Sequence, residues 1–439
     1  MSAPPMRSSW RNTSNPTPSA RPRIPDGLAA RGRPSSTVSP NSYRLSTPPN
    51  TLPPDRDIME GLHTTPLQTI TIPLPGDEDG DIKITDYDFI GSYNWTNNTT
   101  PTIIVPGSPP QWLNRNIPYN VQPDIGPMFC DQNGFRMPSA VLLPLVVAVN
   151  KKTEDEGNPP FDWSSVDFVT DRNGLRKLTR WIGQKEVKDF RIDMQLAGDK
   201  TVLFNRWEKR TKEQFSGRSF GFNFEKESTT PAPGCKNSTG HHRIVTYDLS
   251  GLKMVVRFEV DACFPPPAKS HPRKSTSSID ELAQSLSGVS LSSQPSPSSG
   301  LPSPKNSLTV VKGGNYVSAS AVIELTTRSE YRQNLYDWKE AYPQLFFSQT
   351  AHHFLAVHQR GRFIAVNKRK LTSPELHNVE QIIQPDLRLV RKALDKIKDL
   401  VVKYGERGRL TLVCSNGELK LYERKSLDSC LPNDFLELF

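Results

Sequence analysis

Alternating apolar and polar residues predict a series of β-strands once the chain passes residue 67. Turn residues, such as Gly198-Asp199 and Ser250-Gly251, separate neighbouring segments and favour hairpins between them. The alternation therefore predicts a largely antiparallel arrangement. The expected strands cover 67–74, 102–106, 190–196, 201–204, 243–249, 252–262 and 316–325.

Apolar residues at helical spacing predict two helices among these strands. One begins near Arg172, and the other covers 385–404, with Pro385 in its first turn and Gly405 as a left-handed cap. A hairpin is expected to follow within 410–422, because an Asn-Gly pair separates two strand patterns there. The combination predicts an α/β (α+β) fold with mainly antiparallel or mixed β-sheets and flanking helices.

The composition divides the chain into one domain and two flexible segments. Only 35% of the residues are hydrophobic, and half of the 40 prolines fall in 1–56 and 265–307. Such segments cannot bury enough apolar surface to offset the entropy of ordering. We therefore expect a disordered arm at 1–66 and a single domain at 67–439 that carries a disordered insertion at 265–307.

The net charge of +9 is concentrated in the arm. Residues 1–56 contain eight Arg and two Asp, so they supply most of the excess. An Arg-rich arm either solubilises the protein or binds phosphate backbones. The folded part is nearly neutral, so its charge alone does not argue for nucleic-acid binding.

Several classes of protein are disfavoured by the sequence. The longest apolar run, 140–149, is interrupted by Pro144 and is too short for a bilayer, so no membrane association is expected. The five cysteines have neither zinc-ligand spacing nor a disulfide pattern. These features are typical of an intracellular protein, nuclear or cytoplasmic.

The insertion contains a short helical pattern. Ile279, Leu282, Leu286 and Val289 recur at helical spacing. This pattern either marks a docking helix for a partner within 278–291 or arises by chance in a disordered segment.

Four carboxylates interrupt apolar segments that resemble strands. Glu259 and Asp261 share one strand face, Glu324 follows Ala-Val-Ile, and Glu225 follows Gly-Phe-Asn-Phe. Burying a carboxylate is unfavourable unless a cation accompanies it. Converging carboxylate oxygens would suit Mg²⁺ or Mn²⁺, whereas each residue taken alone could simply face water.

Five motifs in order give the chain a resemblance to the decapping exoribonuclease family, whose fungal founding member partners a nuclear 5′–3′ exoribonuclease. The family has an Arg after an apolar triplet, then Gly-x-x-x-Glu, Glu-x-Asp, Glu-x-Lys, and a Gln in an aromatic helix. The corresponding segments here are Asp167–Arg172, Gly221–Glu225, Glu259-Val-Asp261, Glu324-Leu-Thr326 and Gln344–Gln349.

The resemblance implies a two-sheet fold of the PD-(D/E)XK nuclease type and an activity on RNA 5′ ends: decapping, pyrophosphate removal or 5′–3′ exonuclease cleavage. By resemblance, a site for one or two Mg²⁺ or Mn²⁺ ions would be formed by Glu225, Glu259, Asp261 and Glu324. Arg172 and Gln349 would bind the 5′ phosphate, and a 5′–3′ exoribonuclease is an expected partner.

One departure from the family concerns catalysis directly. Thr326 replaces the family lysine, which helps to orient water and stabilise charge. Another cation, from Lys253, Arg257 or Arg328, could take its place, because these residues share strand parity with the carboxylates. Otherwise the chain is a catalytically impaired relative that binds RNA ends or an exoribonuclease.

The first 160 residues match the family only loosely. The block 92–112 resembles a fungal subgroup often labelled geranylgeranyl diphosphate synthase. Prenyl diphosphate synthases are all-helical and carry two Asp-rich clusters on helices. The only comparable acidic run, 77–81, lies in a Gly/Pro-rich loop, so this activity is a remote alternative.

Overall fold

The computed structural model describes residues 52–76, 80–184, 187–266 and 307–439. The expected arm up to residue 51 and the helical pattern within 278–291 lie outside these residues. The described region begins earlier than residue 67, because Leu62 is buried against Val413 and forms a β-bridge with Arg424.

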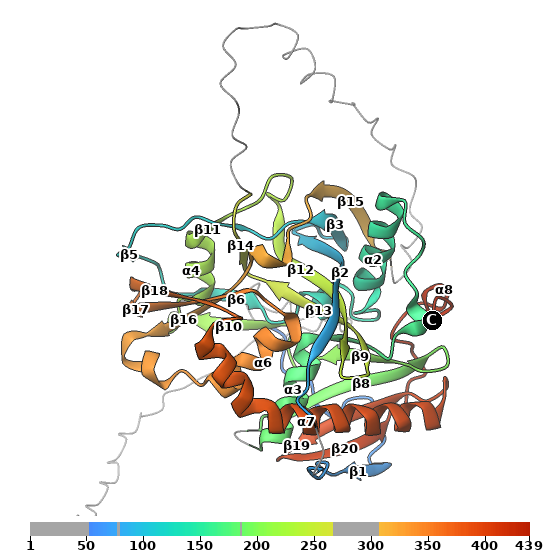
Figure 1. The fold of residues 1–439 in the computed structure, drawn as a ribbon. Coiled ribbons are helices and arrows are strands. Elements are labelled where there is room, and N and C mark those ends of the chain that lie inside the picture. The colour runs from blue at the N-terminus through green and yellow to red at the C-terminus, as the bar shows by residue number, and fades with distance from the viewer. Residues whose placement is uncertain (1–51, 77–79, 185–186, 267–306) are drawn as a thin grey trace, which may run out of the picture. The chain divides into compact units, whose positions relative to one another are not determined.

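One large mixed sheet forms the centre of the fold (Figure 1). Its central strands β7 and β13 run parallel, and most of the other neighbours are antiparallel. The strand order is β1 (Gln68–Ile70), β20 (Glu418–Glu423), β19 (Leu410–Ser415), β8 (Phe190–Ala197), β9 (Thr201–Trp207), β7 (Phe168–Asp171), β13 (Lys253–Val260), β12 (Ser238–Leu249), β2 (Ile84–Thr96), β3 (Thr102–Gly107) and β15 (Thr309–Gly314).

A second, smaller sheet lies beside the first, at the left of Figure 1. Its order is β11 (Thr229–Thr230), β4 (Gln111–Trp112), β14 (Ala262–Cys263), β16 (Val322–Ser329), β17 (His352–Gln359), β18 (Arg362–Lys370) and β5 (Tyr119–Asn120). A separate ribbon pairs β6 (Ile125–Phe129) with β10 (Lys212–Ser216).

Helices cover both faces of the large sheet. The main core packs the sheet against α3 (Arg172–Gly183), α6 (Trp338–Ser348) and α7 (Pro374–Tyr404), which also contact one another. A second core lies under α2 (Leu143–Glu156), against β2 and β3. Short helices complete the described chain: α1 (Gln132–Arg136), α4 (Gly221–Ser228) and α8 (Asn433–Leu436), with 3₁₀ turns at Trp163–Ser165, Ala319–Ala321 and Glu330–Leu335.

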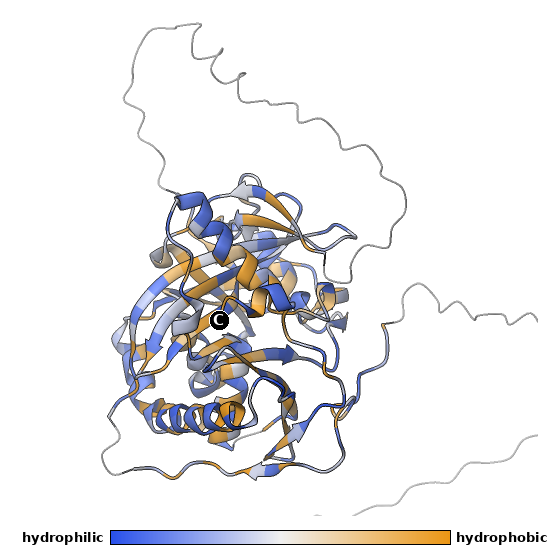
Figure 2. Ribbon diagram, turned by 90° about the vertical axis from the view of Figure 1, so that its right-hand side faces the viewer, coloured by the Kyte–Doolittle hydropathy of each residue, from blue (hydrophilic) through white to orange (hydrophobic). Residues whose placement is uncertain are grey.

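The predicted mixed α+β class is confirmed, and an all-helical prenyl synthase fold does not agree with it. The predicted 385–404 helix is part of α7, which begins earlier, at Pro374, and contains Pro385 in its interior. Figure 2 shows hydrophobic and hydrophilic positions alternating along this helix. In the part of the chain that the structure describes, no helix is long and apolar enough to cross a membrane.

The two sheets meet at one point of the backbone that matters for the site. Strand β13 ends at Val260 in the large sheet, and β14 begins at Ala262 in the small sheet. Asp261 is therefore the single residue between the two sheets. Strands β13 and β16 contact each other across this junction.

Candidate functional site

The four predicted carboxylates gather around the junction of the two sheets. Glu259 lies near the end of β13, Asp261 follows that strand, Glu324 lies on β16, and Glu225 lies on α4. The four groups lie close enough for each to interact electrostatically with at least two of the others. The contacts of β16 with α4 and β13 thus bring together residues that are as much as 99 positions apart in the sequence.

The surroundings disfavour negative charge on these groups. Partial burial, followed by repulsion from Glu259 and Glu324, raises the pKa of Glu225 well above its usual range. Burial, followed by repulsion from Glu324 and Glu225, does the same for the pKa of Asp261. The enclosing protein also raises the pKa of Glu259, although its side chain reaches solvent and Arg206 and Arg172 counteract the effect.

Glu324 is held by two side chains from neighbouring helices. Arg172 Nη1 donates to Glu324 Oε2 at 3.0 Å, and Gln344 Nε2 donates to Glu324 Oε1. Arg172 also lies 3.4 Å from the Ser348 hydroxyl on α6. Strands β7 and β13 are parallel, so their carboxyl ends lie side by side. The start of α3, which follows β7, therefore lies close to Glu259 near the end of β13. The predicted proximity of Arg172 to the carboxylates follows from this topology.

The other two strand carboxylates have weaker or backbone partners. Asp261 Oδ2 accepts a hydrogen bond from the backbone N–H of Leu325 at 2.7 Å. Glu259 Oε1 accepts from Gln132 Nε2 of α1 at 3.4 Å. Both carboxylates therefore keep acceptor capacity for a further donor or cation.

Carboxylate oxygens are the ligands that Mg²⁺ and Mn²⁺ prefer, so the donor chemistry fits a divalent cation. Among the described residues, however, no three Asp, Glu, His or Cys side chains are arranged tightly enough to hold a metal ion. Glu324 is bonded to Arg172 and Gln344 instead. The metal-ligand set remains a prediction.

The strand expected around Glu225 is wrong, because 221–228 form the helix α4. Asp124 stabilises the start of this helix, because its carboxylate accepts from the Asn223 N–H at 2.9 Å, within the first turn. The helix buries Phe224 against Trp112 and Phe363. The Phe-Asn-Phe alternation is typical of a strand with both aromatic residues on one buried face. In the structure only Phe224 is buried, and Phe222 is exposed.

The three suggested replacement cations all have other partners in the described structure. Lys253, at the opposite end of β13 from Glu259, bonds to the Ser165 hydroxyl. Arg257 is fully buried, in an ion pair with Asp171 at 2.6 Å. Arg328 is exposed and its guanidinium stacks over Tyr336.

Thr326 is bonded to a neutral imidazole rather than to a cation. Its hydroxyl lies 3.2 Å from His353 Nε2, which also contacts the Tyr336 hydroxyl at 3.0 Å. Burial lowers the pKa of His353 to about 4, so this histidine carries no charge at neutral pH. His353 therefore cannot supply the positive charge of the missing lysine.

Gln349 has a local hydrogen-bond partner in the described structure. It caps the C-terminus of α6 in a left-handed conformation, and its amide donates to the Phe346 carbonyl. The glutamine that reaches Glu324 is Gln344, five residues earlier. Gln344 lies four residues before Ser348, so both side chains share one face of α6, and Ser348 also contacts Arg172. This helical spacing was the sequence signal that could have identified Gln344. Gln132, which contacts Glu259, gave no signal in the sequence.

The comparisons with known proteins agree with this fold. A model of a family described as "Domain of unknown function (DUF8563)" matches residues 76–439. No curated protein matches the sequence.

Solved structures of similar fold include two yeast proteins. Rai1 of Scheffersomyces stipitis, in complex with (3′-NADP)+ and calcium ion, is 11% identical with a TM-score of 0.53, and the match covers 85% of this chain and 99% of that one. Rai1 of Candida albicans, in complex with pU5-Mn2+, is 13% identical with a TM-score of 0.52, and the match covers 84% of this chain and 98% of that one. At this identity the likeness concerns the fold, and in the fold the resemblance to the decapping exoribonucleases is confirmed.

Proposed function

This chain belongs to the family described as "Domain of unknown function (DUF8563)", and from that premise we propose that it binds RNA 5′ ends and hydrolyses them with a divalent metal ion. The bond attacked would be the pyrophosphate of a cap or triphosphate, or the first phosphodiester. The Rai1 fold supports this proposal, since the Candida albicans relative has been solved with pU5-Mn2+. The same resemblance supports a 5′–3′ exoribonuclease as a binding partner.

The observation that carries the proposal is the gathering of four repelling carboxylates beside an arginine. A protein that needed only stability would not retain Glu225 and Asp261 in positions that disfavour their charge. A Mg²⁺ or Mn²⁺ ion would be held by Glu225, Glu259, Asp261 and Glu324. When bound, the ion neutralises charge that develops on the phosphate and lowers the pKa of water.

The protein's own groups would position the RNA end. Arg172 presents a planar guanidinium at the edge of the carboxylate group, and such a group binds phosphate oxygens in a bidentate manner. Its bond to Glu324 orients both side chains, and Gln344 fixes the second oxygen of the same carboxylate. Arg172 would thus bind the phosphate next to the bond that is broken.

One observation favours a second candidate function, a relative that binds RNA ends without hydrolysing them. Thr326 is uncharged, and His353 beside it is neutral at neutral pH. Two of the suggested replacement cations, Lys253 and Arg257, are bonded to Ser165 and Asp171 instead. Without that charge, the site would retain binding but lose rate.

Turnover of defined RNAs separates the two candidates. Purified full-length protein is incubated with 5′-triphosphate, capped and 5′-monophosphate RNA, with Mn²⁺ or with chelator. A hydrolase shows Mn²⁺-dependent products, which Glu259→Gln reduces by at least about 100-fold. Glu227→Gln is the matched control, because Glu227 is an exposed residue of α4 that pairs with Arg115. Its turnover should equal that of the wild type.

The second candidate predicts binding of the same RNAs without products. In that case Thr326→Lys should generate Mn²⁺-dependent turnover, because it restores a cation beside Glu324. Failure of the wild type to bind any of the three RNA ends, with or without Mn²⁺, would exclude both candidates.

A further inference from the structure

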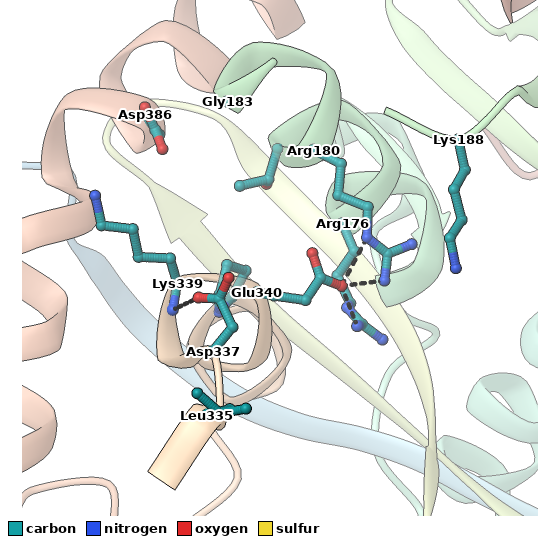
Figure 3. Close-up of a pocket in the computed structure, with 11 residues that line it drawn as sticks. Arg176, Arg180, Gly183, Lys188, Leu335, Asp337, Lys339, Glu340 and Asp386 are labelled. Atoms are coloured by element: carbon teal, nitrogen blue, oxygen red, sulfur yellow. Dashed lines mark hydrogen bonds and ion pairs between the residues drawn. The ribbon is translucent and has the colours of Figure 1, made fainter. Parts of the chain in front are cut away.

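A cavity of about 570 Å³ lies between α3, α6 and α7 (Figure 3). Four cationic side chains line it, together with three carboxylates. The cations are Arg176, Arg180, Lys188 and Lys339. None of the residues used in the proposed hydrolysis lines this cavity. It is a separate place on the molecule with its own chemistry.

One face of helix α3 runs from the carboxylate site to the cavity. Arg172, Arg176 and Arg180 follow each other at intervals of four residues, so they form a stripe with steps of about 6 Å. Arg172 contacts Glu324 in the carboxylate group, and the charges of Arg172 and Glu324 both reach Arg176. Arg180, one turn further, lines the cavity.

Helix α6 follows the same stripe in the opposite direction. Gln344 lies opposite Arg172 at Glu324, and Glu340, one turn earlier, lies opposite Arg176 and Arg180. One oxygen of Glu340, Oε1, accepts all three hydrogen bonds from these arginines, as Figure 3 shows. The carboxylate therefore occupies the position between two guanidinium groups in which a phosphate would fit.

The arginines are not fully satisfied by this one carboxylate. Arg176 Nε is buried and has no hydrogen-bond partner in the described structure. Burial, together with repulsion from Arg180 and Arg172, lowers the pKa of Arg176 to about 10. A second anion here would satisfy the orphan donor and relieve the repulsion.

We infer that the Arg176–Arg180 cavity binds the backbone phosphates of single-stranded RNA beyond its 5′ end, and that Glu340 competes with them for the two arginines. The inference rests on the proposed function, because the RNA would reach the cavity from the end held at Arg172. An RNA chain fits better than a free nucleotide, since the stripe presents cations at successive steps. The protein would then favour long RNAs over short ones.

Binding without turnover tests this inference. Fluorescence anisotropy with full-length protein in chelator compares a 5′-phosphorylated octanucleotide with the 5′-mononucleotide. Arg180→Ala should weaken octanucleotide binding about tenfold and leave mononucleotide binding unchanged. It should also reduce the salt dependence of octanucleotide affinity by roughly 0.7 in the log–log slope for each phosphate that the protein no longer neutralises. Arg210→Ala, which removes an exposed ion pair with Asp55 away from the cavity lining, should change neither value.

The Glu340→Gln variant should change octanucleotide affinity in the opposite direction. It also distinguishes a specific effect on binding from a loss of folded protein. It removes the competing charge, so octanucleotide affinity should rise several-fold, whereas a merely destabilised protein would bind less. Equal losses for both ligands in Arg180→Ala would show that the cavity takes a nucleotide rather than a chain, and would overturn the inference. So would weaker octanucleotide binding by Glu340→Gln. The assay needs no hydrolysis, so either result leaves the turnover test of the proposed function intact.

Discussion

At the scale of single residues, strand parity predicts the face that a charged side chain occupies but not what it meets there. Arg257 shares a face with Glu259, yet it is fully buried and bonds to Asp171, the Tyr93 hydroxyl and the Val141 carbonyl. A guanidinium with its donors committed in this way is a structural group. The sequence could not reveal this, because the partners come from three other segments.

The buried pair predicts a large loss of stability when one partner is removed. Asp171→Asn should lower the free energy of unfolding by about 3–5 kcal/mol, because it leaves the Arg257 charge uncompensated in the core. Chemical denaturation followed by circular dichroism measures the change. Asp55→Asn removes the exposed partner of Arg210 and should change little. A loss for Asp171→Asn no larger than that for Asp55→Asn would contradict the structural role.

At the scale of elements, position on a helix decides which glutamine contacts Glu324. Helix α6 directs Gln344 toward Glu324, whereas Gln349 lies in the left-handed cap, where its amide is used locally. The sequence placed both glutamines in one aromatic segment and could not fix the end of the helix. Helix ends depend on local capping, which an internal aromatic run does not specify.

The two glutamines should therefore respond differently to substitution. Gln344→Ala should reduce turnover of 5′-monophosphate RNA about 10–100-fold, because Glu324 loses the group that fixes one of its oxygens. Gln349→Ala should leave turnover close to that of the wild type. Initial rates at saturating Mn²⁺ compare the two variants. Equal losses in both would place Gln349 at the RNA after all.

Regular patterns predicted other elements well. The Asn-Gly turn and the alternating residues on either side of it predict a hairpin, which is observed as β19 and β20. The strands predicted around 243–262 are observed as β12 and β13. The sequence predicts α7 too short, because Pro385 suits a first turn as well as Pro374, which occupies the first turn in the structure. The side chain of Gln384, beside Pro385, bonds to the backbone of Ile82 and fixes this part of the helix against the segment before β2.

At the scale of the whole molecule, the fold assembles its carboxylates where two sheets meet, and this assembly opposes stability. Glu225 and Asp261 have pKa values raised above those of an unfolded chain, so the native state binds more protons than the unfolded state at intermediate pH. Their contribution to stability is complete in acid, below the ordinary carboxyl pKa of about 4, and is lost as pH rises through the raised values. At neutral pH these two carboxyl groups therefore destabilise the native state relative to the unfolded state.

Removing one of the charges should therefore stabilise the protein at neutral pH. Glu225→Gln should raise Tm relative to the wild type in chelator at pH 7, and the difference should vanish near pH 4, where the native carboxyl is protonated. Mn²⁺ should raise the Tm of the wild type more than that of the variant, because a bound cation offsets the same repulsion. Differential scanning calorimetry across this pH range measures both effects, and Glu227→Gln on the same helix should reproduce neither. A Glu225→Gln protein less stable than the wild type at pH 7 would mean that the carboxylate is needed for packing rather than for a ligand.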